Sequence, residues 1–289
     1  MTVSTPAMGW LPDRPDIRDF SPAHEEISPL LMNTAVPAMG PDKAPASADL
    51  RQWCSPIEDQ GNLGSCTANA AAGVVEYYER RAFGRHIDGS RLFVYKVTRN
   101  LLGLTGDTGA YLRSTMGALS LFGLPPERYW PYDIAKFDLE PSAFCYAFGQ
   151  NYGALKYFRV DTPGKAKATV LSDIKAQVAA GLPAMFGFTV YASMRNPAHA
   201  GEIPLPTGGE QVLGGHAIVA VGYDDGKAIT NPGGGKPTTG AFLIRNSWGT
   251  GWGQGGYGWL PYDYVTTGLA EDWWVLVSAR WTDTGAFAE

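Results

Sequence analysis

The sequence has few cysteines, no long hydrophobic segment and no excess of basic residues. Three cysteines among 289 residues are too few for a disulfide scaffold in a chain of this size. No apolar run is long enough to cross a membrane. The formal charge of −5 leaves no basic surface of the kind that binds nucleic acid. We therefore expect a globular protein that binds neither membranes nor nucleic acid.

Other common signals are missing as well. Residues 1–19 contain no basic region followed by an apolar core, which a secretory signal peptide would need. A cytoplasmic location is the expectation by default, with secretion by another route left open. Histidine, cysteine and acidic residues show neither CxxC nor HExxH spacing, so we expect no metal site and no cofactor. The oligomeric state has no signature in the sequence.

Proline is concentrated at the N-terminus, where eight of the 21 prolines fall in the first 45 residues. This composition is typical of an extended segment that cannot build a core. We call residues 1–47 the N-terminal arm, and they are a candidate pro-segment. We expect residues 48–289 to form the folded domain, with a helical lobe over about 48–160 and a β-rich lobe over about 161–289.

Four stretches of the chain have the spacing of helices. An alanine-rich run follows Cys66, a second stripe begins after Ser90 as its N-cap, a third ends at Gly123, and a fourth ends at Gly181. In later segments, apolar residues either alternate with polar ones or form short continuous runs, as in β-strands. They cover residues 184–191, 217–223 and 242–245, and Asp225-Gly226 predicts a hairpin between residues 217–223 and 227–230. The pattern predicts an α+β protein of two packed lobes with a cleft between them.

Cys66 is the most informative single residue. It stands at the start of the alanine-rich helix, where unpaired backbone N–H groups and the positive end of the helix dipole favour thiolate over thiol. Gln60, six residues earlier, can reach the same place as a hydrogen-bond donor. Taken alone, a single cysteine is more often a small buried apolar residue.

An imidazole and an amide follow in the order that covalent acyl transfer needs. His216 would take the proton of Cys66 and later deliver it to the leaving amine, while the side-chain oxygen of Asn246 would orient the ring. The backbone N–H of Cys66 and the side chain of Gln60 would stabilise the oxyanion. We interpret Cys66, His216, Asn246 and Gln60 as the catalytic residues.

Three motifs closely resemble the papain-like cysteine peptidases, the papain and cathepsin family. They are Gln60-Gly61-x-x-Gly64-Ser65-Cys66, Gly215-His216-Ala217 and the run Asn246-Ser247-Trp248-Gly249. The resemblance implies a helical left lobe, an antiparallel β-barrel-like right lobe, and a peptide substrate that lies extended across the cleft between them. It also implies hydrolysis of peptide bonds without metal or organic cofactor.

The resemblance further implies a set of substrate-binding residues. Asp107, Thr108 and Gly109 occupy the position of the family's substrate wall, and the carbonyl of Gly215 would face the residue before the scissile bond. Trp248 would shield the bond between His216 and Asn246 from water.

Departures from the family pattern point to its short-armed bacterial branch. Leu63 replaces a disulfide cysteine, and Thr67 replaces an aromatic residue. Cys54 and Cys145 either form one disulfide or remain two unpaired thiols.

The sequence predicts a cysteine endopeptidase that acts through a thioacyl intermediate on Cys66. Endopeptidase is preferred because no pair of histidines suggests a loop that caps one end of the cleft. An acyl transferase on the same scaffold and a catalytically silent peptide-binding module are the alternatives. We also predict that the N-terminal arm lies in the cleft and inhibits the enzyme, against the alternative of a disordered or side-docked tail.

Overall fold

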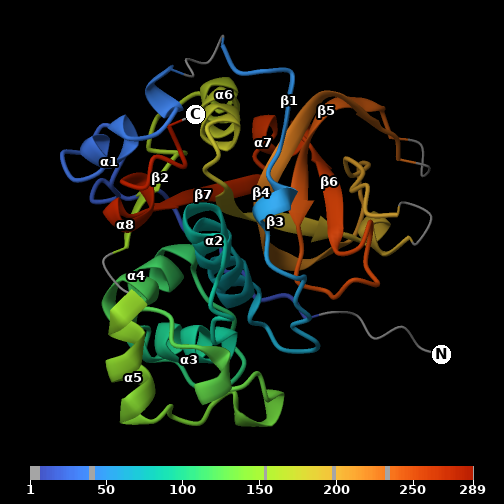
Figure 1. Cartoon of the computed structure of the whole chain (residues 1–289). Coiled ribbons are helices and arrows are strands. Elements are labelled where there is room, and N and C mark those ends of the chain that lie inside the picture. The colour runs from blue at the N-terminus through green and yellow to red at the C-terminus, as the bar shows by residue number, and fades with distance from the viewer. Residues whose placement is uncertain (1–6, 39–42, 153–154, 197–199, 232–234, 289) are drawn as a thin grey trace.

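The computed structural model describes residues 7–38, 43–152, 155–196, 200–231 and 235–288. Figure 1 shows a group of helices packed beside a β-sheet, with α2 between the sheet and the other helices of that group. The helices of this lobe are α2 (Cys66–Phe83), α3 (Arg91–Leu101), α4 (Leu112–Phe122) and α5 (Ala143–Gly149).

The predicted N-cap of one helix and the predicted C-terminal glycine of another are confirmed. The side chain of Ser90 accepts a hydrogen bond from the backbone N–H of Phe93 and caps α3. Gly123 ends α4, and its φ of 69° lies in the left-handed region that glycine tolerates. The fourth predicted helix is α6 (Lys167–Ala179), which packs against the sheet. α5 was not predicted, because its aromatic residues show no clear helical stripe.

The second lobe is built on one seven-stranded antiparallel sheet. Its strands run in the order β2-β7-β3-β4-β5-β6, with β1 paired to β4, and within the described residues the sheet does not close on itself. The strands are β1 (Ser47–Asp49), β2 (Lys156–Arg159), β3 (Ala184–Tyr191), β4 (Val212–Ile229), β5 (Thr238–Arg245), β6 (Tyr257–Pro261) and β7 (Ala270–Val277). The predicted mixture of helices and antiparallel strands is confirmed.

The predicted hairpin at Asp225-Gly226 is wrong. β4 continues through both residues, and its pairing with β5 shifts between Asp224 and Ala228, so these residues form an irregularity in one long strand. The side chain of Asp224 accepts the N–H of Gly226. Lys175 and Tyr262 bind Asp225. These contacts stabilise a bulge within β4, where the dipeptide alone favours a hairpin turn.

Part of the N-terminal arm belongs to the core. Ile27, just before α1 (Ser28–Met32), and Leu31 within that helix are buried. The N–H of Ala35 bonds to the carbonyl of Phe287 at 2.6 Å. The short helices α7 (Asp263–Thr266) and α8 (Ala279–Thr282) flank β7. All three cysteines are buried and unpaired. Among the described residues, no helix combines the length and apolar character needed to span a membrane.

Candidate active site

Cys66 opens α2 at the boundary between the two lobes. Its side chain is fully buried, and its Sγ accepts the backbone N–H of Ala217 on β4 at 3.4 Å. Because Ala217 follows His216, this contact places the thiol against the stretch of β4 that carries the imidazole. The sulfur also lies at the end of an 18-residue helix, whose first N–H groups have no acceptor within the helix.

His216 contacts two side chains, the amide of Asn246 and the indole of Trp248. Its Nε2 lies 2.8 Å from the Oδ1 of Asn246, which stands directly after β5. The ring of Trp248 stacks on the imidazole, with centroids 4.5 Å apart. With Nε2 donating to Asn246, Nδ1 is the nitrogen left to exchange a proton. It has no hydrogen-bond partner among the described residues.

Burial opposes the charged form of both side chains. It raises the pKa of the Cys66 thiol to about 11, and the nearby backbone N–H groups of Ala217, Gly9 and Thr67 lower it only in part. Burial also lowers the pKa of His216 to about 4, although the hydrogen bond to Asn246 opposes this shift. Both shifts favour the uncharged thiol and the uncharged imidazole while water is excluded.

Gln60 is placed to donate into the cleft. Its Oε1 accepts the hydroxyl of Ser247 at 2.6 Å, which fixes the orientation of the amide. Its Nε2 then donates to the carbonyl of Leu63 at 2.9 Å and to the carbonyl of Ala7 at 3.0 Å. The structure thus brings Gln60 to the same cleft as Cys66 and His216.

The three predicted substrate-wall residues make different contacts near the cleft. Asp107 is tied into the lobe, since it accepts the N–H of Gly64 and the hydroxyl of Tyr95. The hydroxyl of Thr108 donates to the neighbouring carbonyl of Gly109. Gly109 faces the cleft, because a Cβ built on it would lie 2.3 Å from the carbonyl oxygen of Gly9.

The backbone that binds an extended segment belongs to the next residue, Ala110. Its N–H donates to the carbonyl of Gly9 at 2.8 Å, and its carbonyl accepts the N–H of Leu11 at 3.1 Å. The carbonyl of Gly215 accepts the N–H of Trp10 at 3.1 Å. Residues 7–11 of the arm, which we call the plug, therefore run through the cleft.

Sequence reasoning gave no role to Ala110, Ser247 or Asp272, although each contributes to this region, and Trp10 lies in the arm that we predicted to occupy the cleft. Backbone groups carry no sequence signal, and the contacts of Trp10 and Asp272 join residues 262 positions apart. Among the described residues, no group of three or more histidine, cysteine or acidic side chains could hold a metal ion.

Comparison with known families decides the class of this site. The sequence model of the papain family cysteine protease matches residues 44–274. The chain belongs to the papain family of cysteine proteases. It is therefore a peptidase, a hydrolase that acts on peptide bonds.

Individual relatives agree with this peptidase assignment. The crystal structure of xylellain, a cysteine protease from Xylella fastidiosa, is 34% identical, covers 94% of this chain and 96% of that one, and superposes with a TM-score of 0.74. An uncharacterised peptidase C1-like protein of Acanthamoeba polyphaga mimivirus is 34% identical over 75% of this chain and 68% of its own length. Cathepsin K of Gallus gallus is 27% identical over 74% of this chain, which spans 58% of its length. The predicted papain-like, two-lobe fold is confirmed.

Proposed function

We propose that this peptidase is an endopeptidase with Cys66 as its nucleophile, and that its plug inhibits it. In the proposed reaction, His216 takes the proton of Cys66 and the thiolate attacks the carbonyl carbon of the substrate. The N–H of Cys66 and the Nε2 of Gln60 stabilise the oxyanion. His216 then protonates the leaving amine, and water hydrolyses the thioester.

The main evidence for the proposed inhibition is that the plug contacts the same groups that would bind a substrate. The carbonyl of Ala7 accepts from Gln60, the N–H of Gly9 faces the Cys66 sulfur, and the N–H of Trp10 donates to Gly215. Each of these groups would bind a substrate in the proposed reaction. The sulfur of Cys66 is fully buried under this segment.

The order of these contacts argues that the plug is not itself a substrate. In a productive complex, one residue would give its N–H to Gly215 and its carbonyl to Gln60. In the plug, Trp10 gives the N–H and Ala7, three residues earlier, gives the carbonyl. The N–H of Gly9 lies against the Cys66 sulfur. The plug therefore presents its N–H and carbonyl groups to Gly215 and Gln60 in a different order from the one proposed for a substrate.

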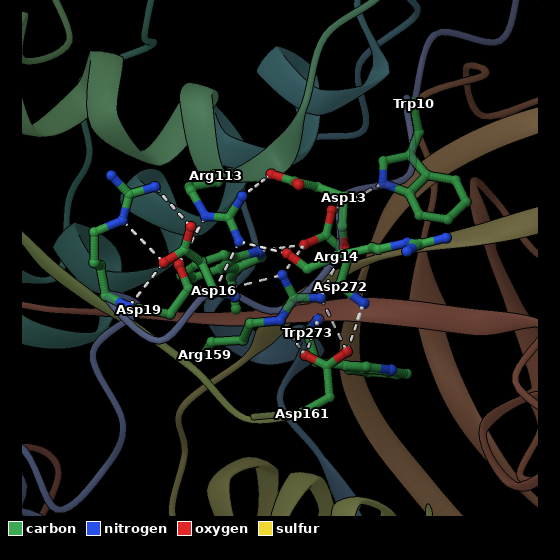
Figure 2. Close-up of polar contacts among 12 residues, drawn as sticks. Trp10, Asp13, Arg14, Asp16, Asp19, Arg113, Arg159, Asp161, Asp272 and Trp273 are labelled. Atoms are coloured by element: carbon green, nitrogen blue, oxygen red, sulfur yellow. Dashed lines mark hydrogen bonds and ion pairs between the residues drawn. The ribbon is translucent and has the colours of Figure 1, made fainter. Parts of the chain in front are cut away.

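Charged contacts hold the arm just after the plug. Arg113 on α4 donates to both carboxylate oxygens of Asp19, at 2.7 and 2.8 Å, and to the carbonyl of Arg14. It also pairs with Asp13 (Figure 2). These bonds join the arm to the helical lobe and support a plug that stays in place.

A single glycine offers a sharp test of both parts of the proposal. A Cβ built on Gly9 would lie 1.8 Å from the carbonyl oxygen of Gly64, so Gly9→Ala should expel the plug without altering the proposed catalytic residues. Gly208→Ala is the matched control, because a Cβ there meets nothing within 4 Å. Hydrolysis of fluorogenic peptides under reducing conditions should rise in Gly9→Ala and stay at the parental rate in Gly208→Ala.

The same assay separates the outcomes. Loss of hydrolysis in the double variant Gly9→Ala/Cys66→Ser would support Cys66 as the nucleophile. An unchanged rate in Gly9→Ala would contradict the inhibitory plug. If a competing amine takes the acyl group in preference to water, the acyl-transferase alternative replaces hydrolysis. Cleavage of internally quenched peptides blocked at both ends tests endopeptidase action.

A further inference from the structure

The hydroxyl of Tyr132 contacts the chain at both ends of the segment that carries the proposed oxyanion donors. Tyr132 lies in the helical lobe, between α4 and α5. Its Oη donates to the backbone carbonyl of Gln60 at 3.1 Å and lies 2.6 Å from the hydroxyl of Ser65. Gln60 carries one proposed donor in its side chain, and Ser65 directly precedes Cys66, whose N–H is the other. One side chain thus joins the two ends of residues 60–66, which we call the oxyanion segment.

The direction of these hydrogen bonds follows from the number of protons available. A tyrosine hydroxyl has one proton, and Tyr132 donates it to Gln60, so the hydroxyl of Ser65 donates to Tyr132. The Oγ of Ser65 accepts in turn from the Nδ2 of Asn69 at 3.0 Å. The hydrogen bonds therefore run in one direction, from the amide of Asn69 to the carbonyl of Gln60.

Asn69 connects this chain of hydrogen bonds to the peptide unit of Cys66. It lies near the start of α2 and is 3% exposed. Its Oδ1 accepts from the guanidinium of Arg91 at 3.3 Å, which fixes the orientation of the amide. Its Nδ2 also donates to the backbone carbonyl of Ser65 at 3.0 Å. Because this carbonyl and the N–H of Cys66 belong to one planar peptide unit, the bond orients that N–H as well.

Tyr132 is itself held by charged groups of the helical lobe. The guanidinium of Arg91 lies over its ring, 4.2 Å from the centroid. Arg91 is fixed by ion pairs with Glu58 at 2.7 Å and Glu127 at 2.8 Å. Glu127 also accepts the backbone N–H of Tyr132 at 3.2 Å. These partners all lie outside the arm, so we expect Tyr132 to keep its position when the plug leaves.

We propose that Tyr132 is a positioning residue that sets the spacing between the two oxyanion donors, the Nε2 of Gln60 and the N–H of Cys66. This inference rests on the proposed function, in which these donors stabilise the oxyanion. Removing one such donor costs about 10²–10³-fold in kcat. Without the hydroxyl of Tyr132 both donors remain, but their spacing is no longer fixed. The expected loss is therefore smaller, about 10-fold.

The test removes this hydroxyl in the full chain with its plug expelled. In the Gly9→Ala background, Tyr132→Phe should lower kcat for fluorogenic peptides by about 10-fold, with little change in KM. Alkylation of Cys66 by iodoacetamide, followed by mass spectrometry, should keep its rate, because displacement of iodide forms no oxyanion. A displaced thiol would slow both reactions. Tyr129→Phe is the matched control and should leave both rates unchanged, since the hydroxyl of Tyr129 accepts from the exposed Arg128.

A double-mutant cycle tests whether Tyr132 acts through the donors. Gln60→Ala leaves a single donor, so spacing no longer matters and Tyr132→Phe should add almost no further loss of kcat. Ser65→Ala interrupts the same chain without removing a helix cap, because Ser65 makes no side-chain cap bond to α2. It should lower kcat by a similar factor. An unchanged kcat in Tyr132→Phe, an equal loss with and without Gln60→Ala, or a parallel loss of alkylation would each overturn the inference while the peptidase function stands.

A peptide aldehyde gives a readout that does not need turnover. The thiol of Cys66 adds to the aldehyde carbonyl and its proton passes to the oxygen, which then lies where the oxyanion would form. If no form of the protein hydrolyses peptides, the proposed function fails, and calorimetric titration of the aldehyde still decides the inference. Weaker binding to Tyr132→Phe, with equal binding of the matching alcohol, would support it. Equal binding of the aldehyde, or none, would overturn it. Thermal unfolding of each variant verifies that it is folded.

Discussion

At the scale of single residues, the hydroxyl of Ser247 controls which end of the Gln60 amide faces the cleft. It donates to Oε1 and leaves Nε2 for the proposed oxyanion. We predict that Ser247→Ala in the Gly9→Ala background lowers kcat by roughly 10-fold, with less change in KM, because the amide then loses its fixed orientation. Ser247→Thr should restore most of the rate, since it keeps the hydroxyl. Steady-state kinetics with an unchanged kcat in Ser247→Ala would contradict this positioning role.

The pKa of the Cys66 thiol gives a second prediction at this scale. Burial raises the pKa of this thiol to about 11, so the thiol is mostly protonated at pH 7 and its ionised fraction grows as the pH rises. Alkylation of the parental chain by iodoacetamide should therefore be slow at pH 7 and accelerate toward pH 11. Gly9→Ala should react faster at pH 7, because water reaches the site and the desolvation that raises the pKa is relieved.

Cys66→Ser provides the control for this measurement, since it reports the alkylation of Cys54 and Cys145 alone. Equal rates for Gly9→Ala and the parental chain at pH 7 would show that the plug does not govern the thiol.

The sequence also limits what can be foreseen residue by residue. Cys66, His216, Asn246 and Gln60 lie in motifs, and the structure brings them to one cleft; their roles stay predictions. The placement of Asp272 has no local signal, because it depends on a bulge in β7 and on a left-handed backbone that short-range preferences disfavour. Ala110 could not be distinguished from Gly109, since its contribution is made by backbone groups.

At the scale of elements, apolar patterning located α3, α4, α6 and β3. The buried residues of α4 repeat with the helical period, whereas β3 was located by a continuous apolar run whose first five residues are all buried. It failed at Asp225-Gly226, where pairing of β4 with β5 overrides a strong turn preference. Local sequence predicts an element best where burial follows one face, and worst where a distant strand decides the path of the chain.

The contact between α4 and the arm yields a prediction at this scale. We expect Arg113→Gln to raise peptide hydrolysis by the full chain several-fold, because the arm loses its bonds to Asp19, Asp13 and the carbonyl of Arg14. Added salt should also raise the parental rate, since screening weakens partly exposed ion pairs. Arg85→Gln, at an exposed arginine outside this contact, is the control. No change in Arg113→Gln would mean that the plug alone holds the arm.

At the scale of the whole molecule, the arm is joined to the core at Ile27. This side chain is fully buried in the core that both lobes share. We predict that Ile27→Ala lowers the free energy of unfolding by about 2–4 kcal/mol, as for other large-to-small core exchanges. Urea denaturation followed by fluorescence measures this change. Ile17→Ala is the control, because Ile17 is 95% exposed and should have almost no effect. A similar loss in both variants would contradict the assignment of Ile27 to the core.

This anchor has a consequence for the kinetics of inhibition. A plug tethered at Ile27 meets its cleft at a fixed effective concentration, which for short flexible connections is of millimolar order, however dilute the protein is. Inhibition would then be unimolecular and insensitive to dilution. A single cut in the exposed turn at Arg18 would convert it to a bimolecular equilibrium, because residues 1–18 would no longer be connected to the anchor. The same plug sequence would then dissociate from the cleft at low protein concentration. Cleavage of one peptide bond would therefore change inhibition from independent of protein concentration to dependent on it.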